Sequence, residues 1–390
     1  MFASRTEWDL RKNRYTQALD ELRAGGHDLL DLTVSNPTAC GMRYDGPAIL
    51  GVFQDPRSLH YDPTPKGLLS ARQSVAAYYL EKGATVLPED ILLTTSTSEA
   101  YSFLFRLLCA PGDEVLVPRP GYPLFDFLAQ IQDVRLRPYA LVYDHGWQID
   151  FHSLESAISE RTRAVLLVHP NNPTGSFVSQ SEQTRLSSIC ARHDLAIVSD
   201  EVFHDFAFIQ HPAASLAANT GALTFTLSGL SKISGLPQMK AAWCVVSGPP
   251  QLKQQALARL EVIADTYLSV NTPIQIALPT LLGWRRSFQP ELRQRLSDNL
   301  AELDRQLAGQ ETCRHLVVDG GWYATLRVPV TGTDEDLAID LMREEGVIVH
   351  PGHFFDFESE GFLVLSLMTP QQDFGEGVRR ILSRFQKLQK

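Results

Sequence analysis

The sequence lacks the features that mark a disulfide scaffold, a membrane protein or a cysteine-based metal site. Its five cysteines lie far apart without paired spacing, so no disulfide framework is expected and a reducing compartment fits. The longest apolar runs, such as 164–168, are far shorter than the ~20 residues that a membrane-spanning helix needs. The N-terminal segment carries charges where a signal peptide is apolar. We therefore expect a cytoplasmic protein with no membrane partner.

Basic charge is also scarce. The 390 residues contain 35 Lys and Arg against 45 Asp and Glu, a formal net charge of −10. This balance argues against a nucleic-acid partner, because such a surface needs clustered cations. The eleven histidines show no ligand-spaced motif such as H-E-x-x-H, so no metal site is expected. What is present, 44% hydrophobic and 21% charged residues, is typical of a globular chain of two or three domains.

Helical and strand-like segments alternate from about Leu68 onward. Residues 164–169 and 195–199 are continuously apolar, which is typical of parallel strands covered on both faces. Residues 180–193, between these two runs, have helical spacing. Further strand-like runs lie at 91–95, 114–118, 224–227 and 241–246. The alternation predicts an α/β layered fold.

The C-terminal part has a different pattern, in which long helical segments precede short strands. This pattern predicts a smaller α+β domain that begins between Thr280 and Pro290. The first ~45 residues carry no sheet-core pattern and are expected to pack with this domain. The predicted division is a segment 1–45, a large domain 46–283 and a small domain 284–390.

Four polar segments follow predicted strands, at the edge where open α/β sheets bind ligands. In the first, Ser96, Thr97 and Ser98 begin a helix, which suits a phosphate group or a plain N-cap. In the second, the HPNNPTG loop after the strand at 164–169 holds Asn172 in a rigid turn.

The other two segments carry charged side chains. Asp200 ends a buried strand, where a carboxylate needs a cationic partner or hydrogen bonds, or acts as a helix cap. Lys232 lies among small residues after a strand and is followed by Lys240. A lysine in this setting forms a Schiff base, contacts a phosphate or is simply an exposed loop charge.

The four segments occur in one order along the chain, together with Tyr61-Asp62-Pro63, the PGDEV motif at 111–115 and the PGYP motif at 120–123. In this the chain resembles the class I/II aminotransferases of the fold-type-I pyridoxal-phosphate (PLP) superfamily, from about Leu29 to the C-terminus. The resemblance implies an aspartate-aminotransferase-like fold. That fold has a large PLP-binding domain, with a mostly parallel seven-stranded sheet sandwiched by helices, and a smaller α+β domain. The resemblance also implies PLP as cofactor and a homodimer with shared active sites.

The resemblance assigns roles to individual residues. Lys232 would form the Schiff base with PLP and carry a proton, Asp200 would keep the ring nitrogen protonated, and Tyr122 would stack on the ring. Asn172 would hydrogen-bond the ring hydroxyl, and Asn36 would line the substrate side. The phosphate contacts would come from Ser96, Thr97, Ser98, Ser228, Lys240 and, toward the neighbouring subunit, Tyr61.

Two cofactor positions depart from the family pattern. Phe203 stands where many relatives carry a tyrosine that donates to the ring hydroxyl, so the Schiff base should have a higher pKa than in a Phe203→Tyr variant. Lys240 replaces the usual arginine at the phosphate, which keeps the charge but loses the two-donor fork.

A third departure concerns the substrate. Val364 stands where relatives carry the arginine that grips the substrate carboxylate, so another group must bind it or the substrate lacks it. His350 and His353 lie nearby, and His353 is the residue we expect to contact the substrate.

The overall prediction is an aminotransferase that moves an amino group from a small or apolar amino donor to a 2-oxo acid through Lys232. The alternative is a PLP-dependent lyase or decarboxylase on the same scaffold, because of Val364. A non-catalytic PLP-binding module is a third class, against which the intact Lys232 and Asp200 argue.

Overall fold

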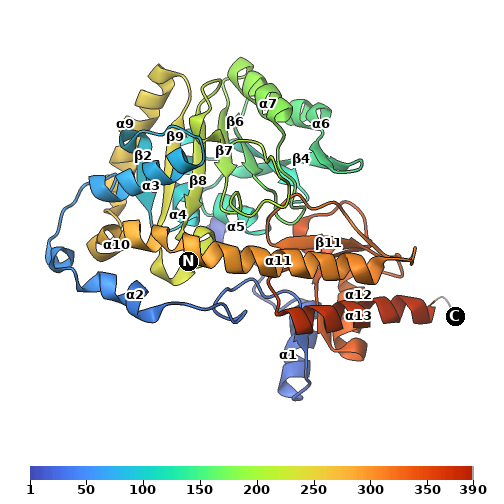
Figure 1. Ribbon diagram of the computed structural model, residues 1–390. Coiled ribbons are helices and arrows are strands. Elements are labelled where there is room, and N and C mark those ends of the chain that lie inside the picture. The colour runs from blue at the N-terminus through green and yellow to red at the C-terminus, as the bar shows by residue number, and fades with distance from the viewer. Residues whose placement is uncertain (389–390) are drawn as a thin grey trace.

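A mostly parallel sheet of eight strands forms the centre of the computed structural model, which describes residues 1–388 (Figure 1). In spatial order its strands are β2 (Ile91–Thr94), β9 (Ala242–Ser247), β8 (Thr224–Gly229), β7 (Ala196–Asp200), β6 (Thr162–Val168), β3 (Glu114–Arg119), β4 (Arg135–Tyr143) and β5 (Trp147–Ile149). The α/β class is confirmed. The resemblance implied seven strands, and the eighth is β5, which turns back antiparallel onto β4.

The directions of the strands determine which edge of the sheet carries the polar segments. Strands β4, β3, β6, β7 and β8 pair in parallel, while β9 runs antiparallel to both β8 and β2. Strand β2 therefore points the same way as β8. The carboxyl ends of β2, β3, β6, β7 and β8 meet at one edge, which is where the polar segments follow.

Both faces of the sheet are covered because the central strands are apolar on both sides. Along β6, Ala164 and Leu166 face a core with α4 (Thr97–Leu108) and α9 (Pro250–Tyr267). Val165 and Leu167 face a core with α6 (Phe151–Ala157) and α7 (Gln180–Arg192). Each fully buried Val or Leu side chain contributes about 1.5–3 kcal/mol to folding. The unbroken apolar runs in the sequence arise from this two-sided burial.

Further helices complete this part of the molecule. They are α2 (Gly46–Gly51), α3 (Leu69–Glu81), α5 (Leu124–Gln130), α8 (Leu230–Ile233) and α10 (Thr272–Gly283). Helices α3 and α10 pack together over the end of the sheet that carries β2 and β9.

A second, antiparallel sheet forms the C-terminal part, with its own core. Its strands are β10 (Arg314–His315), β11 (Tyr323–Arg327), β14 (Phe362–Ser366) and β13 (His350–Pro351). The helices around it are α1 (Arg14–Ala24), α11 (Arg285–Leu307), α12 (Asp334–Asp340) and α13 (Gln371–Leu388). Strand β1 (Leu30–Asp31) pairs with β12 (Val347–Ile348), which joins the N-terminal segment to this part.

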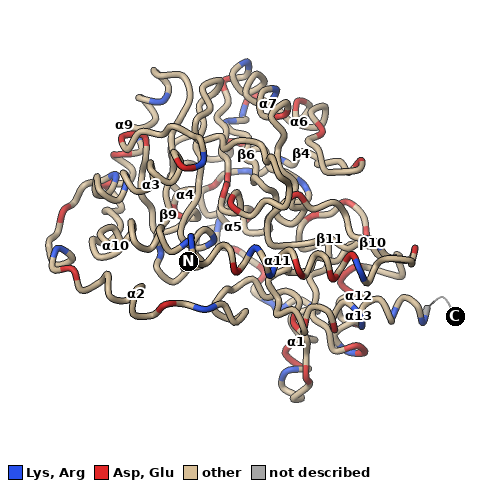
Figure 2. Tube along the Cα trace, in the orientation of Figure 1, with Lys and Arg blue, Asp and Glu red and all other residues tan. Residues whose placement is uncertain are grey.

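Charged residues are dispersed over the molecule. Figure 2 shows acidic and basic residues interspersed along the chain, for example along α11. Within residues 1–388, no helix has the length and apolar character needed to cross a bilayer. The same part of the chain has no group of three or more His, Cys, Asp or Glu side chains placed to hold a metal ion.

Candidate active site

A cavity of about 490 Å³ opens at the carboxyl edge of the large sheet. Its wall combines the loops after β2, β3, β6, β7 and β8 with residues of the C-terminal part. Eight residues singled out in the sequence line it together: Ser96, Thr97, Ser98, Tyr122, Asn172, Asp200, Phe203 and Lys232. These residues are spread over more than a third of the chain, and the shared direction of the strands brings them to one place.

Lys232 lies in the short helix α8, directly after β8, and its amine faces aromatic rings. Its Nζ is 4.7 Å from the ring centre of Trp322 and 5.5 Å from that of Phe203. Burial lowers the pKa of Lys232 to about 8, while the charge of Asp200 opposes this shift. About a tenth of the amine is therefore unprotonated, and nucleophilic, at pH 7, against less than about a thousandth for an ordinary lysine.

Asp200 is the last residue of β7 and is buried. Its carboxylate accepts hydrogen bonds from the Tyr101 hydroxyl (2.9 Å) and from the backbone N–H of Val202 (3.1 Å). Burial raises the pKa of Asp200 to about 6, although both hydrogen bonds lower it. The carboxylate is thus oriented by its neighbours and gains from a cationic partner in the cavity.

Tyr101 was not predicted from the sequence as a functional residue. It lies on α4 within an apolar stretch, where a tyrosine is indistinguishable from an ordinary core side chain. The structure shows it fully buried, with its hydroxyl donating to the Asp200 carboxylate.

The start of α4 supplies hydroxyl groups and free amides. Ser96 caps the helix by accepting from the N–H of Glu99 at 3.1 Å, and Thr97 and Ser98 form its first turn. The first N–H groups of a helix have no partner within it and attract anions. The cap interpretation and the phosphate interpretation are therefore compatible here.

Gly229 and Ser231 complete this side of the cavity, although Ser228 was the residue predicted from the sequence. A Cβ on Gly229 would lie 2.8 Å from the Cβ of Ala242 on the neighbouring strand β9, so only glycine fits. Ser228 is buried beneath the wall, and its Oγ lies 3.5 Å from the carbonyl oxygen of Glu201.

The loop after β6 presents Asn172 because its neighbour Asn171 holds the loop in place. The Asn171 amide donates to the carbonyl of Pro120 (3.1 Å) and to Thr174 Oγ1 (3.0 Å). The N–H of Gly175 closes the turn on the Asn171 carbonyl at 2.8 Å. Asn172 faces the cavity, and its Oδ1 is buried without a hydrogen-bond partner in residues 1–388. A buried acceptor in this state favours a ligand that donates a hydrogen bond.

Three other predicted contacts lie off the cavity wall. Lys240 is exposed and left-handed (φ 51°), because it ends a short 3₁₀ turn. Tyr61 is exposed on the loop after residues 56–59. The Oδ1 of Asn36 caps its own turn by accepting from Thr38, and it is Ser35 that lines the cavity.

The histidine predicted from the sequence also lies away from the cavity. His353 is exposed on a 3₁₀ turn (Gly352–Phe355), where its ring packs on Phe354, whereas His350 on strand β13 lines the cavity. Val364 on β14 is fully buried and pairs directly with His350. His353 lies in the turn after the two-residue strand of His350, and the sequence spacing of the two histidines did not reveal this difference.

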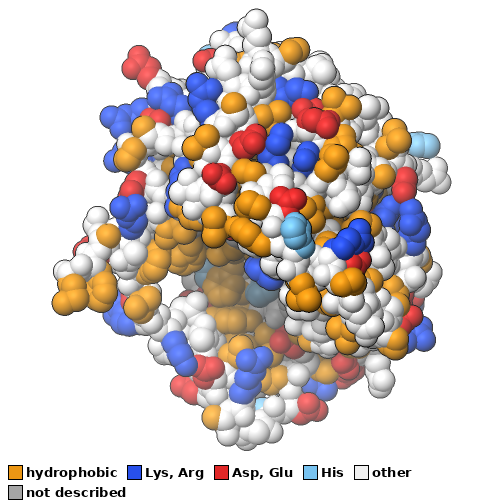
Figure 3. All heavy atoms as spheres, turned by 90° about the vertical axis from the view of Figure 1, so that its left-hand side faces the viewer, with side chains coloured by type: hydrophobic (Ala, Val, Ile, Leu, Met, Phe, Trp, Pro, Cys, Tyr) orange, Lys and Arg blue, Asp and Glu red, His pale blue; other side chains and the backbone are white. Residues whose placement is uncertain are grey.

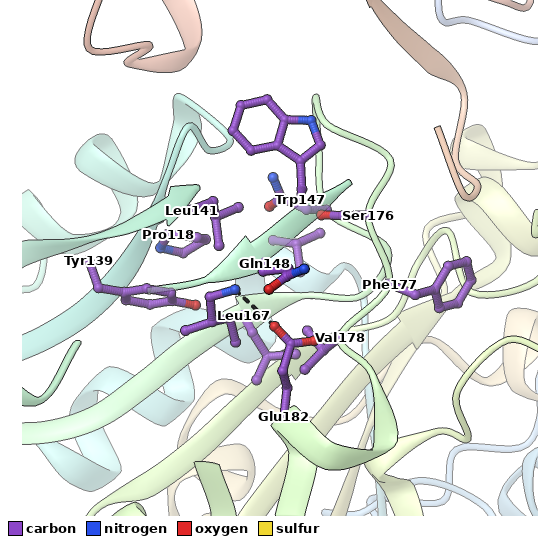
Figure 4. Close-up of a pocket in the computed structure, with 13 residues that line it drawn as sticks. Pro118, Tyr139, Leu141, Trp147, Gln148, Leu167, Ser176, Phe177, Val178 and Glu182 are labelled. Atoms are coloured by element: carbon purple, nitrogen blue, oxygen red, sulfur yellow. Dashed lines mark hydrogen bonds between the residues drawn. The ribbon is translucent and has the colours of Figure 1, made fainter. Parts of the chain in front are cut away.

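A second, much smaller cavity lies behind the loop of Asn171 and is separate from this site (Figure 4). Its volume of about 20 Å³ is enough for one water molecule and too small for a substrate. The Glu182 carboxylate closes it by accepting from the N–H of Ile149 at 2.9 Å. Glu182 also completes the capping box of α7 with Ser179. The residues around this small cavity therefore help to hold the loop of Asn171 in place.

The arrangement at the large cavity fits PLP. An amine with a lowered pKa, a buried carboxylate for a ring nitrogen, an unpaired amide oxygen for a ring hydroxyl and a helix start for a phosphate all face one space. Tyr122, half-exposed in the wall, offers an aromatic face for a ring.

Comparison with known proteins leads to the same family along nearly the whole chain. The family Aminotransferase class I and II matches residues 29–381. A glutamate-pyruvate aminotransferase, AlaA of Haemophilus influenzae, is 28% identical over 376 residues, which cover 92% of this chain and 91% of that protein. An alanine aminotransferase of Mycobacterium bovis is 28% identical over 372 residues, covering 92% and 86%.

Solved structures agree on the fold. An aspartate aminotransferase of Thermus thermophilus matches with a TM-score of 0.82 at 23% identity, covering 99% of each chain. Identity this low shows a shared fold alone, and it confirms the expected aspartate-aminotransferase-like architecture. The family match extends that conclusion to the chemistry and favours transamination over the lyase alternative. The chain belongs to the class I and II aminotransferases, and it is a PLP-dependent enzyme of that family.

Proposed function

We propose that this aminotransferase takes its amino group from a small or apolar amino acid of the alanine type and passes it to a 2-oxo acid. The observation that carries the proposal is the cavity wall: beyond the groups expected to hold PLP, it is built mainly from Phe125, Val202, Phe354, Phe355 and Tyr323. No arginine lines it in the described chain, so a second carboxylate on the donor has no cationic partner. The name of the alanine aminotransferase relative supports the same donor.

A donor panel tests this proposal. The holoenzyme is mixed with alanine, 2-aminobutyrate, leucine, aspartate or glutamate, and the absorbance change of the bound cofactor and the 2-oxo acid formed are recorded. We expect alanine and 2-aminobutyrate to have kcat/KM values at least about tenfold above aspartate, because burying an unpaired carboxylate costs more than about 1.4 kcal/mol. A preference for aspartate would contradict the proposal. Ammonia release without an aminated acceptor would indicate a lyase.

We propose Lys232 as the covalent attachment point and the proton carrier. When bound, PLP supplies an aldehyde for an amine and a ring that accepts the electron pair left at the donor's Cα. The neutral amine of Lys232 provides the nucleophile for attachment, and once displaced by the donor its Nζ takes the proton from Cα. Its place at the carboxyl end of β8, beside the cavity, supports both roles.

We propose supporting roles for the remaining residues. The Asp200 carboxylate holds a proton on the ring nitrogen, Tyr122 packs on the ring, and Asn172 binds the ring hydroxyl through its unpaired side chain. Phe203 contributes only packing near that hydroxyl, since it has no donor. Phosphate binding is proposed for Ser96, Thr97, Ser98 and Ser231, while Ser228 and Lys240 stay predictions.

The lowered pKa of Lys232 leads to a test by pH. Below about pH 8 the rate at which the cofactor-free enzyme attaches PLP should rise about tenfold per pH unit, and above it the rate should level off, because only the neutral amine reacts. An ordinary lysine, with a pKa of about 10.4, would show a rise that continues past about pH 10. Stopped-flow absorbance between about pH 6 and 10 measures this, with N-acetyl-lysine as reference. A rate still rising steeply above about pH 9 would show that burial does not depress the amine.

We propose that the enzyme is a cytoplasmic homodimer with shared active sites. The segment that follows α2 carries Leu59 and Tyr61 far out on the surface, 93% and 66% exposed. It lies on the side of the molecule shown in Figure 3, where hydrophobic side chains surround a deep hollow. Exposed apolar side chains gathered on one face favour a protein partner. In a second copy, Tyr61 would reach the phosphate end of the site.

The three-part division of the chain is also a proposal. The separate cores of the two sheets support a large domain at 46–283 and a small one at 284–390. The pairing of β1 with β12 supports the attachment of residues 1–45 to the small domain.

A further inference from the structure

The carboxylate of an amino donor has no evident cationic partner in the cavity. Among the described residues, Lys232 is the only lysine or arginine of the wall, and Asp200 opposite it is negative. The amine of Lys232 is required for the chemistry at Cα. A carboxylate that enters an apolar space without hydrogen-bond donors loses several kcal/mol of hydration. A side chain of the wall that donates a hydrogen bond would offset this loss.

His350 is placed to do so. It lies on β13 and pairs directly with Val364 on β14, so the imidazole stands beside the position that carries valine. Its ring lines the cavity and packs edge-on against Phe355, with ring centres 5.8 Å apart. Phe354 lies at 6.2 Å on the same side. Aromatic packing of this kind holds the ring in one orientation.

The two nitrogens of His350 have different surroundings. Nδ1 is buried and has no hydrogen-bond partner within residues 1–388. Nε2 is not left buried and unpaired in this way. An N–H left unpaired in the interior costs more than an unpaired lone pair, which favours the proton on Nε2. Burial also lowers the pKa of His350, so the ring is mainly neutral at pH 7 and has one N–H to donate. That N–H is on the nitrogen a ligand can reach.

We propose that His350 binds the carboxylate of the amino donor through Nε2–H and thereby selects α-amino acids over simple amines. The inference rests on the proposed function and deepens it, because it names how the substrate is recognised. The hydroxyls of Ser35 and Tyr323, which hydrogen-bond each other, also line the cavity, and the pair keeps one O–H to donate to the same carboxylate. Binding by neutral donors replaces the two-donor fork of a guanidinium.

Binding of an unreactive carboxylate tests the inference without turnover. Propanoate has the shape of alanine without its amine, and propanamide has the same shape without the charge. Calorimetric titration of the holoenzyme should give a Kd for propanoate about 10- to 100-fold higher in His350→Phe than in the wild type, which is the range for a hydrogen bond to a charged group. The Kd for propanamide should rise less, by about 2- to 10-fold, because it loses only a neutral hydrogen bond. His350→Gln, which keeps an N–H donor, should lie between.

The competing assignment is tested in the same experiment. His353→Phe removes the neighbouring exposed histidine and should leave the affinity for propanoate unchanged. The inference is overturned if His350→Phe binds propanoate as the wild type does, or if His353→Phe is the variant that loses it. It is also overturned if His350→Phe and His350→Gln weaken both ligands equally, since that reports a distorted wall.

Kinetics separate this inference from the proposed function. In the His350 variants KM for alanine should rise about 10- to 100-fold while kcat changes much less, because the interaction is made in the ground state as well as in the transition state. If the wild-type enzyme forms no pyruvate from alanine, the proposed donor is wrong. If it does and the variants keep their KM, only the role of His350 fails.

Discussion

Replacing Lys232 with alanine is expected to lower kcat/KM for any amino donor by about 10⁴-fold or more. A positioned general base alone contributes about 10²–10⁴-fold, and this lysine also provides the covalent attachment of the cofactor. The variant should still bind PLP, because Asp200, Asn172 and the start of α4 are untouched. Steady-state rates and equilibrium dialysis of PLP measure the two properties independently.

Two controls distinguish a loss of catalysis in Lys232→Ala from a loss of folding. Lys12→Ala removes an exposed lysine whose amine pairs with Asp20, and it serves as the matched control with unchanged rates. A primary amine added to the Lys232→Ala enzyme should restore part of the activity, since it supplies the missing base. A variant that keeps more than about a hundredth of the wild-type kcat/KM would show that another residue moves the proton.

Replacing Asp200 with asparagine is expected to lower kcat by about 10²–10³-fold, the usual cost of removing one pre-oriented electrostatic contact from a transition state. The neutral amide cannot hold a proton on a ring nitrogen, so the electron pair left at Cα is less well stabilised. Tyr101→Phe removes one hydrogen bond to the same carboxylate (2.9 Å) and should cost about tenfold, the value of a single hydrogen bond to a charged group. Rates with alanine at saturating PLP measure both.

For the stability of the cofactor-free enzyme, replacing Asp200 should have the opposite effect: it lowers kcat but should not lower stability. Burial raises the pKa of Asp200 to about 6, above the value of about 3.9 in an unfolded chain, so the folded chain binds more protons between those values. Its stability therefore falls as pH rises from about 4 to 6, and the full cost remains at about pH 8. A neutral asparagine side chain at this position would not carry this cost, and the cofactor-free Asp200→Asn protein should unfold at an equal or higher temperature at about pH 8. Lower stability there, with normal stability at about pH 4, would contradict the assigned pKa.

The sequence determined the large sheet and most of its ligand-binding edge. The apolar run at 164–168 predicts a strand buried on both faces, and β6 is one. Because the carboxyl ends of such strands share an edge, the residues that follow them had to lie together. Asp200, Asn172 and Lys232 were predicted on this basis, Tyr122 was predicted from the resemblance to the family, and all four line one cavity.

Residues that reach the site from outside that edge were not predictable in the same way. Tyr101 lies in a largely apolar stretch of a helix. Only the packing of α4 against β7 brings its hydroxyl to Asp200. Ser228 lies near the end of β8 and Lys240 follows that strand, but the left-handed turn at Lys240 and the burial of Ser228 take both side chains off the wall. A local motif fixes the order of residues, while side-chain direction depends on backbone dihedrals that the motif leaves open.

The two histidines His350 and His353 show the same difference between what the sequence determines and what the fold decides. The amino-acid sequence was enough to identify the family and the cofactor, and to show that no arginine lies between Arg343 and Arg379. Which histidine lines the cavity depended on the fold, because the pairing of β13 with β14 is a contact between segments separated by a turn and a loop. His350 is held by its partner on β14, whereas His353 lies in the turn that follows β13, and pairing across a sheet cannot be read from sequence spacing.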